Sequence, residues 1–351
     1  MRAAILTAFD TPLEIAELPA PSPSSPHDVL VRVAGAGVCG SDVHLVEGMF
    51  ESVLGQPKFP YVLGHENAGY VEAIGEAVST VKVGDPVLVH PHITCGLCRS
   101  CRRGDEAFCE ALAFPGIDGQ TPGGFAEIFR TSERSIIKLP NGTNPAPLAP
   151  LADAGLTAYH AVRRAVPDLP PDGTAVVVGL GGIGYFVLQL LRVFSPAHII
   201  AVDVNEEKIR LGQRLGADAA LRSGPDLVDN ILKITDGVGA DLVMDCVGVE
   251  PIPSQALDML RRGGTYSVLG ADKGEACCGT VALTGRELTL RGNLVGTLGE
   301  LSELVQIVIR NRLALTQTFY PLGKAADAVE DLRKGRVEGR AVIVPADNQA
   351  Y

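Results

Sequence analysis

The stretch TAVVVGLGGIG, residues 174–184, decides the fold of the second half of the chain. Its first part is a continuous apolar run, which is typical of a strand buried on both faces of a parallel sheet. The glycine pattern GLGGIG follows at 179–184, and the residues after it have the spacing of a buried helix. A glycine-rich turn between such a strand and such a helix predicts a phosphate-binding site for a dinucleotide.

Each glycine of this turn has a physical reason. Gly179 permits the tight turn, Gly181 lets the backbone approach a pyrophosphate, and Gly184 lets the helix pack closely on the sheet. Gly182 opens the helix, whose free N–H groups and positive dipole end would face the phosphates. We therefore expect Gly179, Gly181, Gly182 and Gly184 to bind a nucleotide.

Asp203 ends the next predicted strand, HIIAVD at 198–203. Its carboxylate can accept both ribose hydroxyls of an adenosine and would repel a 2′-phosphate. The next residues, Val204 and Asn205, supply no cation to offset that repulsion, so NAD(H) is favoured over NADP(H). The alternative is a glycine-rich turn followed by a solvated aspartate.

Strand-like and helix-like segments alternate from residue 155 to 292, including the predicted helix SQALDMLRRGG at 254–264. This alternation predicts an α/β fold with a doubly wound parallel sheet. Short, valine-rich, turn-bounded segments before it predict a mostly β domain. Residues 293–351 mix helix-like and strand-like patterns, so we expect this last part of the chain to belong to the mostly β domain as well. The expected domains are thus 1–154 with 293–351, and 155–292.

The chain has 351 residues, a net charge of -11 and 46% hydrophobic residues. The acidic balance argues against partners such as nucleic acid or an anionic membrane. No uninterrupted apolar stretch approaches the roughly 18 residues of a membrane span, and the first residues lack a signal-peptide core. We expect a cytoplasmic protein, in which the eight cysteines indicate metal binding or catalysis before disulfides.

Four cysteines cluster in CGLCRSCRRGDEAFC at 95–109. Four thiolates in one short loop can close a tetrahedral zinc site without an open position, which is typical of a structural metal. An iron–sulfur cluster is the alternative metal, although the bacterial ferredoxin spacing differs. The proposed ligands are Cys95, Cys98, Cys101 and Cys109.

A second set of residues becomes meaningful only in combination. Taken singly, Cys39 is a core thiol, His65 a satisfied histidine and Asp153 a helix N-cap. However, GVCGSDVH (37–44), GHE (64–66), the four-cysteine loop, DAGLTAYHA (153–161) and GLGGIG occur in this order. With these five motifs the chain resembles the zinc-dependent alcohol dehydrogenases of the medium-chain dehydrogenase/reductase superfamily over nearly its full length.

The resemblance implies a GroES-like catalytic domain, a Rossmann domain and two Zn²⁺ ions per subunit, one catalytic and one structural. The catalytic zinc would be held by Cys39, His65 and Asp153, with Glu66 as a neighbouring or alternate ligand. Many relatives have cysteine where this chain has Asp153, so the alternative is that Asp153 only caps its helix. Ser41 and His44 match the residues that carry the substrate proton to the surface; the alternatives are a turn serine and an exposed histidine.

Further residues match cofactor contacts of the family. Gly40 stands where some relatives have an arginine for the pyrophosphate, so Arg340 would supply that charge alone. Lys208 matches a contact to the adenosine ribose, with an ordinary helix lysine as the alternative. The residues expected near the nicotinamide are Thr157, Ile183 and Leu269.

The expected reaction is reversible hydride transfer between an alcohol and NAD+, giving a ketone or aldehyde and NADH. A secondary alcohol is expected, and a polyol or another specialised alcohol is the alternative. A zinc-independent reductase of the superfamily would lack Cys39, His65 and the four-cysteine loop. A nucleotide-binding sensor is the non-enzymatic alternative. The expected partners are a small-molecule alcohol or carbonyl substrate and, by family habit, a homodimer or homotetramer.

Overall fold

The computed structural model describes residues 1–310 and 312–345. They form two compact units. Unit 1 contains Met1–Asp153, Thr297–Gln306 and the chain from Ala314, and unit 2 contains Ala154–Gly296 and Ile307–Leu313. Ile307–Leu313 therefore groups with unit 2, whereas the sequence prediction counted all of 293–351 with the first domain.

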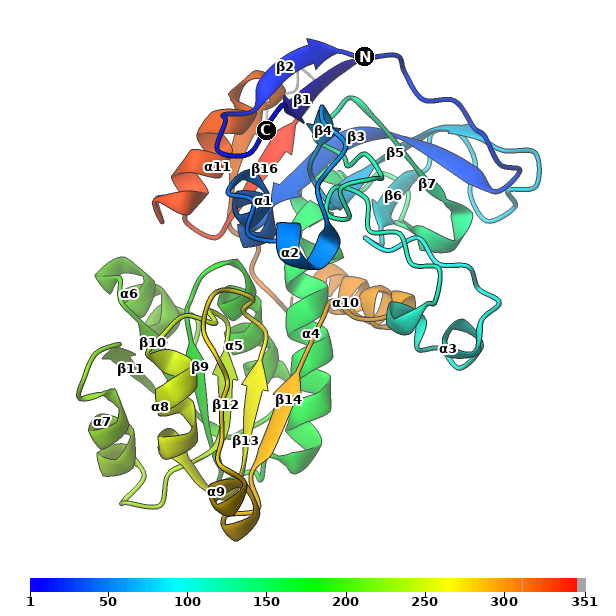
Figure 1. Ribbon diagram of the computed structural model, residues 1–351. Coiled ribbons are helices and arrows are strands. Elements are labelled where there is room, and N and C mark those ends of the chain that lie inside the picture. The colour runs from blue at the N-terminus through cyan, green and yellow to red at the C-terminus, as the bar shows by residue number, and fades with distance from the viewer. Residues whose placement is uncertain (311, 346–351) are drawn as a thin grey trace. The chain divides into compact units, whose positions relative to one another are not determined.

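Unit 2 is built on the predicted parallel sheet (Figure 1). Its six strands lie in the order β11-β10-β9-β12-β13-β14, and all paired neighbours are parallel. This is the order of a doubly wound nucleotide-binding sheet, in which the strand order reverses beside β9, and it confirms the predicted fold class. The strands are β9 Thr174–Val178, β10 His198–Asp203, β11 Ala219–Arg222, β12 Ala240–Asp245, β13 Leu260–Val268 and β14 Thr289–Gly292.

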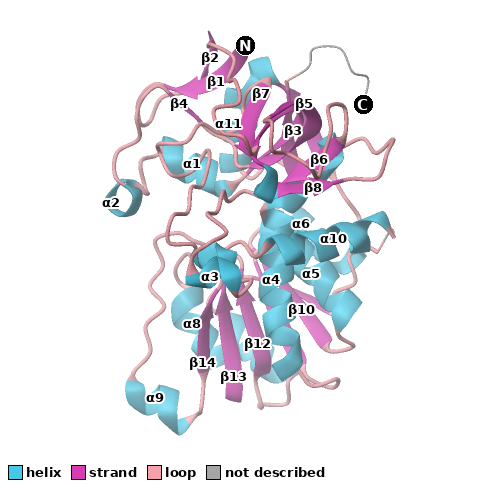
Figure 2. Cartoon of the chain, turned by 90° about the vertical axis from the view of Figure 1, so that its right-hand side faces the viewer, coloured by secondary structure: helices cyan, strands magenta, loops and turns pink. Residues whose placement is uncertain are grey.

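Helices pack against the strands of this sheet (Figure 2). Helix α5 contacts β9 and β10, whereas α8 contacts β12 and β13. The predicted helix at 254–264 is too long, because the chain enters β13 at Leu260 and pairs with β12 across an irregularity between Ala240 and Leu242. Gly263 and Gly264 also disfavour helix. The helices are α4 Ala154–Ala165, α5 Gly182–Phe194, α6 Glu206–Arg214, α7 Leu227–Ile234, α8 Ile252–Met259, α9 Thr280–Gly285 and the short η4 Val166–Asp168.

Unit 1 is mostly β, as predicted. A three-stranded sheet has the order β2-β1-β4, and a seven-stranded sheet has the order β15-β16-β3-β5-β6-β8 with β7 paired to β3. The strands of the small sheet are β1 Arg2–Leu6, β2 Glu14–Glu17 and β4 Tyr61–Val62. Those of the large sheet are β3 Asp28–Val38, β5 Glu66–Ile74, β6 Pro86–Val89, β7 Ile128–Ser132, β8 Ile136–Lys138, β15 Gln317–Pro321 and β16 Arg340–Val344.

Short helices fill the connections of unit 1 (Figure 1). They are α1 Gly40–Val46, α2 Glu51–Leu54, α3 Arg99–Arg102, η1 Glu106–Phe108, η2 Glu133–Ser135, η3 Ala146–Ala152, η5 Leu322–Lys324 and α11 Ala325–Arg333. The longer α10 spans Leu298–Ile309. Helix α1 contacts α11, and η3 contacts β3, β5 and β16. The segment η3 thus lies against the large sheet.

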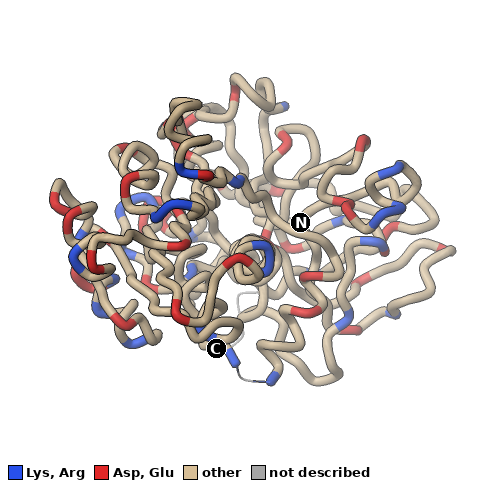
Figure 3. Tube along the Cα trace, turned by 90° about the horizontal axis from the view of Figure 1, so that it is seen from below, with Lys and Arg blue, Asp and Glu red and all other residues tan. Residues whose placement is uncertain are grey.

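Each unit has its own apolar interior. In unit 1, Val31, Val33, Leu63 and Phe125 are almost fully buried, and in unit 2 the valine-rich strands bury their side chains as the continuous apolar pattern predicted. Lys and Arg positions are interspersed with Asp and Glu positions along the chain (Figure 3). Among the helices described, none is long and apolar enough to cross a membrane.

The glycine-rich turn in unit 2 has the geometry that its residues require. Gly179 has a φ of 83°, in the left-handed region that favours glycine. A Cβ atom added at Gly184 would lie 1.7 Å from the carbonyl oxygen of Gly179, whereas one added at Gly181 would meet nothing within 4 Å. Close packing therefore demands glycine at 184, while position 181 has open space beside its backbone.

The two positions should consequently respond differently to the same substitution. We expect Gly184→Ala to lower the free energy of unfolding by about 1–3 kcal/mol, because backbone must move to admit the methyl group. Gly181→Ala, with a φ of -72° and open space, should cost less than about 1 kcal/mol. Urea denaturation followed by circular dichroism measures both; equal losses would contradict this account of the turn.

Candidate active site

Four buried side chains of unit 1 converge into one cluster. Cys39, His65, Glu66 and Asp153 each offer one potential ligand atom, and these atoms all lie within 4.8 Å of one another. Strand pairing explains part of the convergence, because Gly37 on β3 lies opposite Glu66 on β5. Asp153 follows η3, which contacts both strands. The structure thus brings together the residues that the sequence named separately.

The atoms of the cluster are sulfur, nitrogen and oxygen donors. His65 Nε2 lies 3.1 Å from Asp153 Oδ2, and Cys39 Sγ lies 3.8 Å from the same oxygen. Burial opposes protonation of His65, but the charges and hydrogen bonds of Asp42 and Asp153 raise its pKa well above the ordinary value. A thiol, an imidazole and a carboxylate in a buried, acid-rich site fit a zinc ion that keeps a position for an exchangeable ligand.

Asp42 completes the surroundings of the cluster, and the sequence analysis missed it. Its Oδ2 accepts a 2.8 Å hydrogen bond from the backbone N–H of Cys39, and its Oδ1 lies 3.6 Å from His65 Nδ1. A carboxylate behind a ligating imidazole fixes the ring orientation and the tautomer. The available signal was the acidic residue three positions after Cys39, in the first turn of α1.

Glu66 forms a buried ion pair with Arg340, whose Nη2 contacts Glu66 Oε1. The side chains are 0% and 3% exposed, respectively. Burial raises the pKa of Glu66, whereas the guanidinium opposes that rise. Arg340 begins β16, so the pair joins the C-terminal strand to the cluster. A contact of Arg340 with a pyrophosphate stays a prediction.

Ser41 and His44 lie on α1, directly after Cys39. The hydroxyl oxygen of Ser41 is 3.9 Å from Cys39 Sγ, which places it beside the cluster. His44 is half-buried and packs edge-on against Phe50, with ring centroids 5.6 Å apart. The spacing puts both residues within one helical turn, and their role in proton transfer stays a prediction.

The four cysteines of the loop 95–109 also converge, with all sulfur atoms within 4.8 Å of one another. Backbone N–H groups of Leu97 and Cys98 donate to Cys95 Sγ at 3.4 and 3.3 Å. These bonds lower the pKa of Cys95 to about 6, which favours the thiolate that binds metal. The loop therefore offers a closed four-sulfur site, as a structural zinc requires.

In unit 2, Asp203 is 7% exposed and bonded to the turn beside it. Its Oδ2 accepts a 2.7 Å hydrogen bond from Leu180 N–H, and its Oδ1 accepts one of 2.9 Å from Asn205 N–H. The carboxylate is thereby fixed at the carboxyl end of β10, next to the glycine turn that follows β9. This edge of a parallel sheet is where such folds bind nucleotides.

Four other predicted cofactor residues belong to unit 2, whereas Arg340 belongs to unit 1. Thr157 and Leu269 are buried, while Ile183 and Lys208 are partly exposed. Ile183 stands in the first turn of α5, whose N-cap Gly181 makes no side-chain capping bond. The first N–H groups of α5 are therefore not occupied by a capping side chain, which suits a phosphate.

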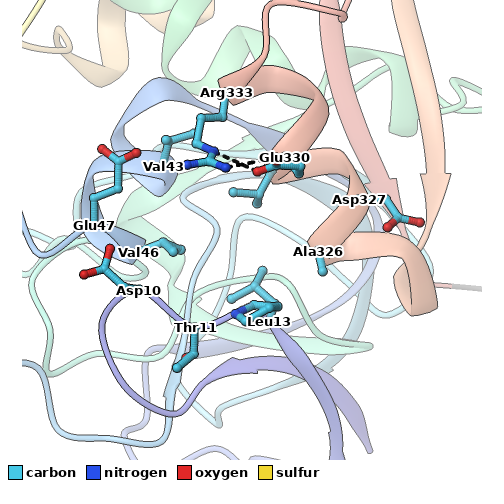
Figure 4. A pocket seen from close by; sticks show the side chains of 12 residues that line it. Asp10, Thr11, Leu13, Val43, Val46, Glu47, Ala326, Asp327, Glu330 and Arg333 are labelled. Carbon is cyan, nitrogen blue, oxygen red and sulfur yellow. Dashed lines mark hydrogen bonds and ion pairs between the residues drawn. The ribbon is translucent and has the colours of Figure 1, made fainter.

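A separate pocket of unit 1 lies between the β1–β2 turn, α1 and α11 (Figure 4). Its lining includes Asp10, Val43, Glu47 and Arg333, and Arg333 bonds to Glu330 within it. None of its lining residues belongs to the two candidate metal clusters. This pocket is therefore separate from both candidate metal sites.

Comparisons with known proteins agree with this arrangement. A family model described as alcohol dehydrogenase GroES-like domain matches residues 25–141, and one described as zinc-binding dehydrogenase matches residues 182–310. An NAD-dependent alcohol dehydrogenase of Sulfurisphaera tokodaii is 34% identical over 98% of this chain and 100% of the relative. A D-arabinose 1-dehydrogenase (NADP(+)) of Saccharolobus solfataricus is 32% identical over 98% of this chain and 97% of the relative.

Solved structures are similar over the same length. The crystal structure of an alcohol dehydrogenase from Aeropyrum pernix matches with a TM-score of 0.95 and 42% identity. The match covers 98% of this chain and 100% of that protein. The likeness therefore includes both units.

The buried ion pair of Glu66 and Arg340 leads to a stability prediction. Arg340→Met should lower the free energy of unfolding by about 3–5 kcal/mol, because it leaves the Glu66 charge buried without its cation. Adding Glu66→Gln should restore part of that loss, since the double variant buries no unpaired charge. Chemical denaturation of the four proteins in the mutant cycle measures the coupling.

Arg333→Met is the matched control, because its ion pair with Glu330 is exposed to solvent. It should cause no measurable loss. Additive effects of Arg340→Met and Glu66→Gln would contradict the coupling.

Proposed function

Because the chain belongs to the zinc-dependent alcohol dehydrogenases of the medium-chain dehydrogenase/reductase superfamily, we propose that it transfers hydride reversibly between an alcohol and NAD+. The convergence of Cys39, His65 and Asp153 in a buried cluster carries this proposal. Three protein ligands leave the fourth coordination position of a zinc ion to a substrate oxygen, whereas the four-sulfur set fills all four positions.

In this proposal Cys39, His65 and Asp153 hold the catalytic zinc, and Glu66 is a neighbouring or alternate ligand. Bound zinc supplies Lewis-acid chemistry that stabilises negative charge on the alcohol or carbonyl oxygen of the substrate. Asp42 keeps His65 in the orientation for ligation through Nε2. A carboxylate at Asp153 is a harder and less electron-donating ligand than a thiolate, which favours a stronger Lewis acid.

The proton of the alcohol leaves through residues of α1. Ser41 lies beside Cys39, where its hydroxyl could accept the proton of the substrate alcohol while donating its own. His44 is partly exposed, so its imidazole can hand a proton on to solvent. General acid–base help of this kind typically contributes about 10²–10⁴-fold in rate.

NAD+ is the hydride acceptor in this proposal. The turn Gly179–Gly184 would bind the pyrophosphate, and the open space beside Gly181 gives room for it. Asp203 would accept the ribose hydroxyls, with Lys208, Thr157, Ile183, Leu269 and Arg340 as further contacts. One relative uses NADP(+) by name, so the choice of cofactor has to be tested on this chain.

The four-cysteine loop would hold the second, structural zinc through Cys95, Cys98, Cys101 and Cys109. It would tie together a segment with few regular elements, since only α3 and η1 lie within it. The secondary alcohol as substrate, the cytoplasmic location and the homodimeric or homotetrameric state stay predictions.

Metal analysis tests the two zinc sites. The purified protein should contain two zinc ions per chain, and Asp153→Ala should retain about one and lose alcohol oxidation. Removing zinc with a chelator should abolish activity, and added zinc should restore it. Inductively coupled plasma spectrometry and NADH absorbance measure both properties.

Asp327→Ala, an exposed aspartate of the same unit, is the control and should keep both ions. Full activity in metal-free protein would refute the proposed chemistry. If the wild type instead bound NADH but oxidised no alcohol in a broad panel, a nucleotide-binding sensor would be favoured.

Asp203 should determine the cofactor. Asp203→Gly is expected to lower the ratio of kcat/KM for NAD+ over NADP+ at least about tenfold, because it removes the charge that repels a 2′-phosphate. Asp203→Asn, which keeps an acceptor for Leu180 N–H, should shift the ratio in the same direction. Asp236→Gly is the control, since Asp236 already has a φ of 52° and tolerates glycine. An unchanged ratio in both Asp203 variants would contradict the role of its charge.

A further inference from the structure

His92 is a buried histidine that neither metal cluster includes. It lies after β6 and three residues before Cys95, and it is 1% exposed. Within residues 1–310 and 312–345, neither of its ring nitrogens has a hydrogen-bond partner. Buried polar side chains almost always find a partner, so each exception in a native structure needs an explanation, such as a catalytic role or a bound water or ion.

The main chain of His92 is held by hydrogen bonds, and its ring packs edge-on against His90 and Phe114. Its N–H donates to His90 Nδ1 at 3.2 Å, and its carbonyl oxygen accepts a 2.8 Å hydrogen bond from Ser135 Oγ. The neighbouring His90 thus uses a ring nitrogen within the fold. His92 lies in the same segment, but neither of its ring nitrogens has a hydrogen-bond partner among the described residues.

The ring of His92 shares a packing partner with the Cys39 cluster. Phe114 packs against both His92 and His65, and its ring centroid is 4.5 Å from that of His92 and 5.6 Å from that of His65. Both contacts are edge-on. Burial lowers the pKa of His92 to about 3, the charge of His90 lowers it too, and the smaller influences of Asp153 and His65 act in opposite directions. His92 therefore belongs to the same packed group of side chains as His65, a member of the cluster.

A neutral imidazole offers one N–H donor and one nitrogen acceptor. A hydroxyl group can serve either nitrogen, because it both donates and accepts. An anionic group such as a carboxylate or phosphate would instead seek charged or multiple donors, which a neutral ring does not provide. The chemistry of His92 therefore favours an uncharged hydroxyl.

We propose that His92 binds a second hydroxyl group of the substrate, close to the carbon that is oxidised, and so selects vicinal diols and polyols. This inference rests on the proposed alcohol dehydrogenase function. The selectivity arises because a simple alcohol leaves the buried ring without a partner, whereas a diol supplies one.

A pair of substrates of equal carbon skeleton tests the proposal. Butane-2,3-diol, assayed as each stereoisomer, is compared with butan-2-ol, using the zinc-loaded enzyme and NAD+. We expect the wild type to prefer at least one diol isomer about tenfold or more in kcat/KM. His92→Phe should lower that preference at least tenfold, while kcat/KM for butan-2-ol stays equal or rises, because an apolar ring of similar shape needs no partner.

Two further variants separate recognition from structure. His92→Gln retains a donor and an acceptor and should recover part of the diol preference. His27→Phe replaces an exposed histidine of the same unit and should leave the preference unchanged. A loss of activity towards both alcohols in His92→Phe, with both zinc ions retained, would overturn the proposal in favour of a structural role.

Binding without turnover supplies an independent readout. Glycolamide and propanamide are unreactive carbonyl compounds of similar size. Only glycolamide carries a hydroxyl group on the carbon next to the carbonyl, where a diol substrate has its second hydroxyl. In calorimetric titrations of the NADH complex, the wild type should bind glycolamide more tightly, and His92→Phe should bind both equally. Equal binding by the wild type would overturn the proposal.

The outcomes distinguish a failure of the proposed alcohol dehydrogenase function from a failure of the proposed role of His92. If the wild type oxidises neither butan-2-ol nor the diols with NAD+ or NADP+, the proposed function fails. If it oxidises butan-2-ol, and His92→Phe leaves the preference between diol and alcohol unchanged, only the role of His92 fails.

Discussion

The carboxylate of Asp42 is the contact on which the candidate catalytic cluster depends. It accepts a hydrogen bond from the backbone N–H of Cys39 and faces the ring of His65. One buried side chain thus positions residues from two separate segments. Because Asp42 lies in the first turn of α1, the same contact orients the helix that carries Ser41 and His44. The metal ligands and the residues for proton transfer therefore share one anchor.

The cluster concentrates acidic groups where burial makes charge expensive. Asp42, Glu66 and Asp153 are buried together with the thiol of Cys39, and Arg340 forms an ion pair with Glu66. An isolated charge in such surroundings would be strongly unfavourable. A bound divalent cation resolves this imbalance, because it compensates the remaining negative groups at the site where they converge. The electrostatics that make negative charge costly in this cluster thus favour the binding of a metal ion there.

The sequence predicts those parts of the molecule that local patterns determine. The alternation of apolar strands and helices identified the parallel sheet, and the glycine turn and the four-cysteine loop are contiguous motifs. The beginning of β13 at Leu260 was missed because pairing with β12, not local propensity, decides it. Asp42 and His92 were not assigned a role, since their significance arises from tertiary neighbours such as His65 and Phe114. The pairing of Glu66 with Arg340 joins residues too far apart for any local pattern to report.

The order of assembly follows from these long separations. Cys39, His65, Asp153 and Arg340 come from four distant segments, and η3 and β16 bring the last two against β3 and β5. Loop-closure entropy makes such contacts costly until the sheet has formed. The unfolded chain therefore holds no preformed catalytic site, and metal bound there must stabilise the folded unit. The four-cysteine loop differs, because its ligands are close in sequence and can converge before the sheet is complete.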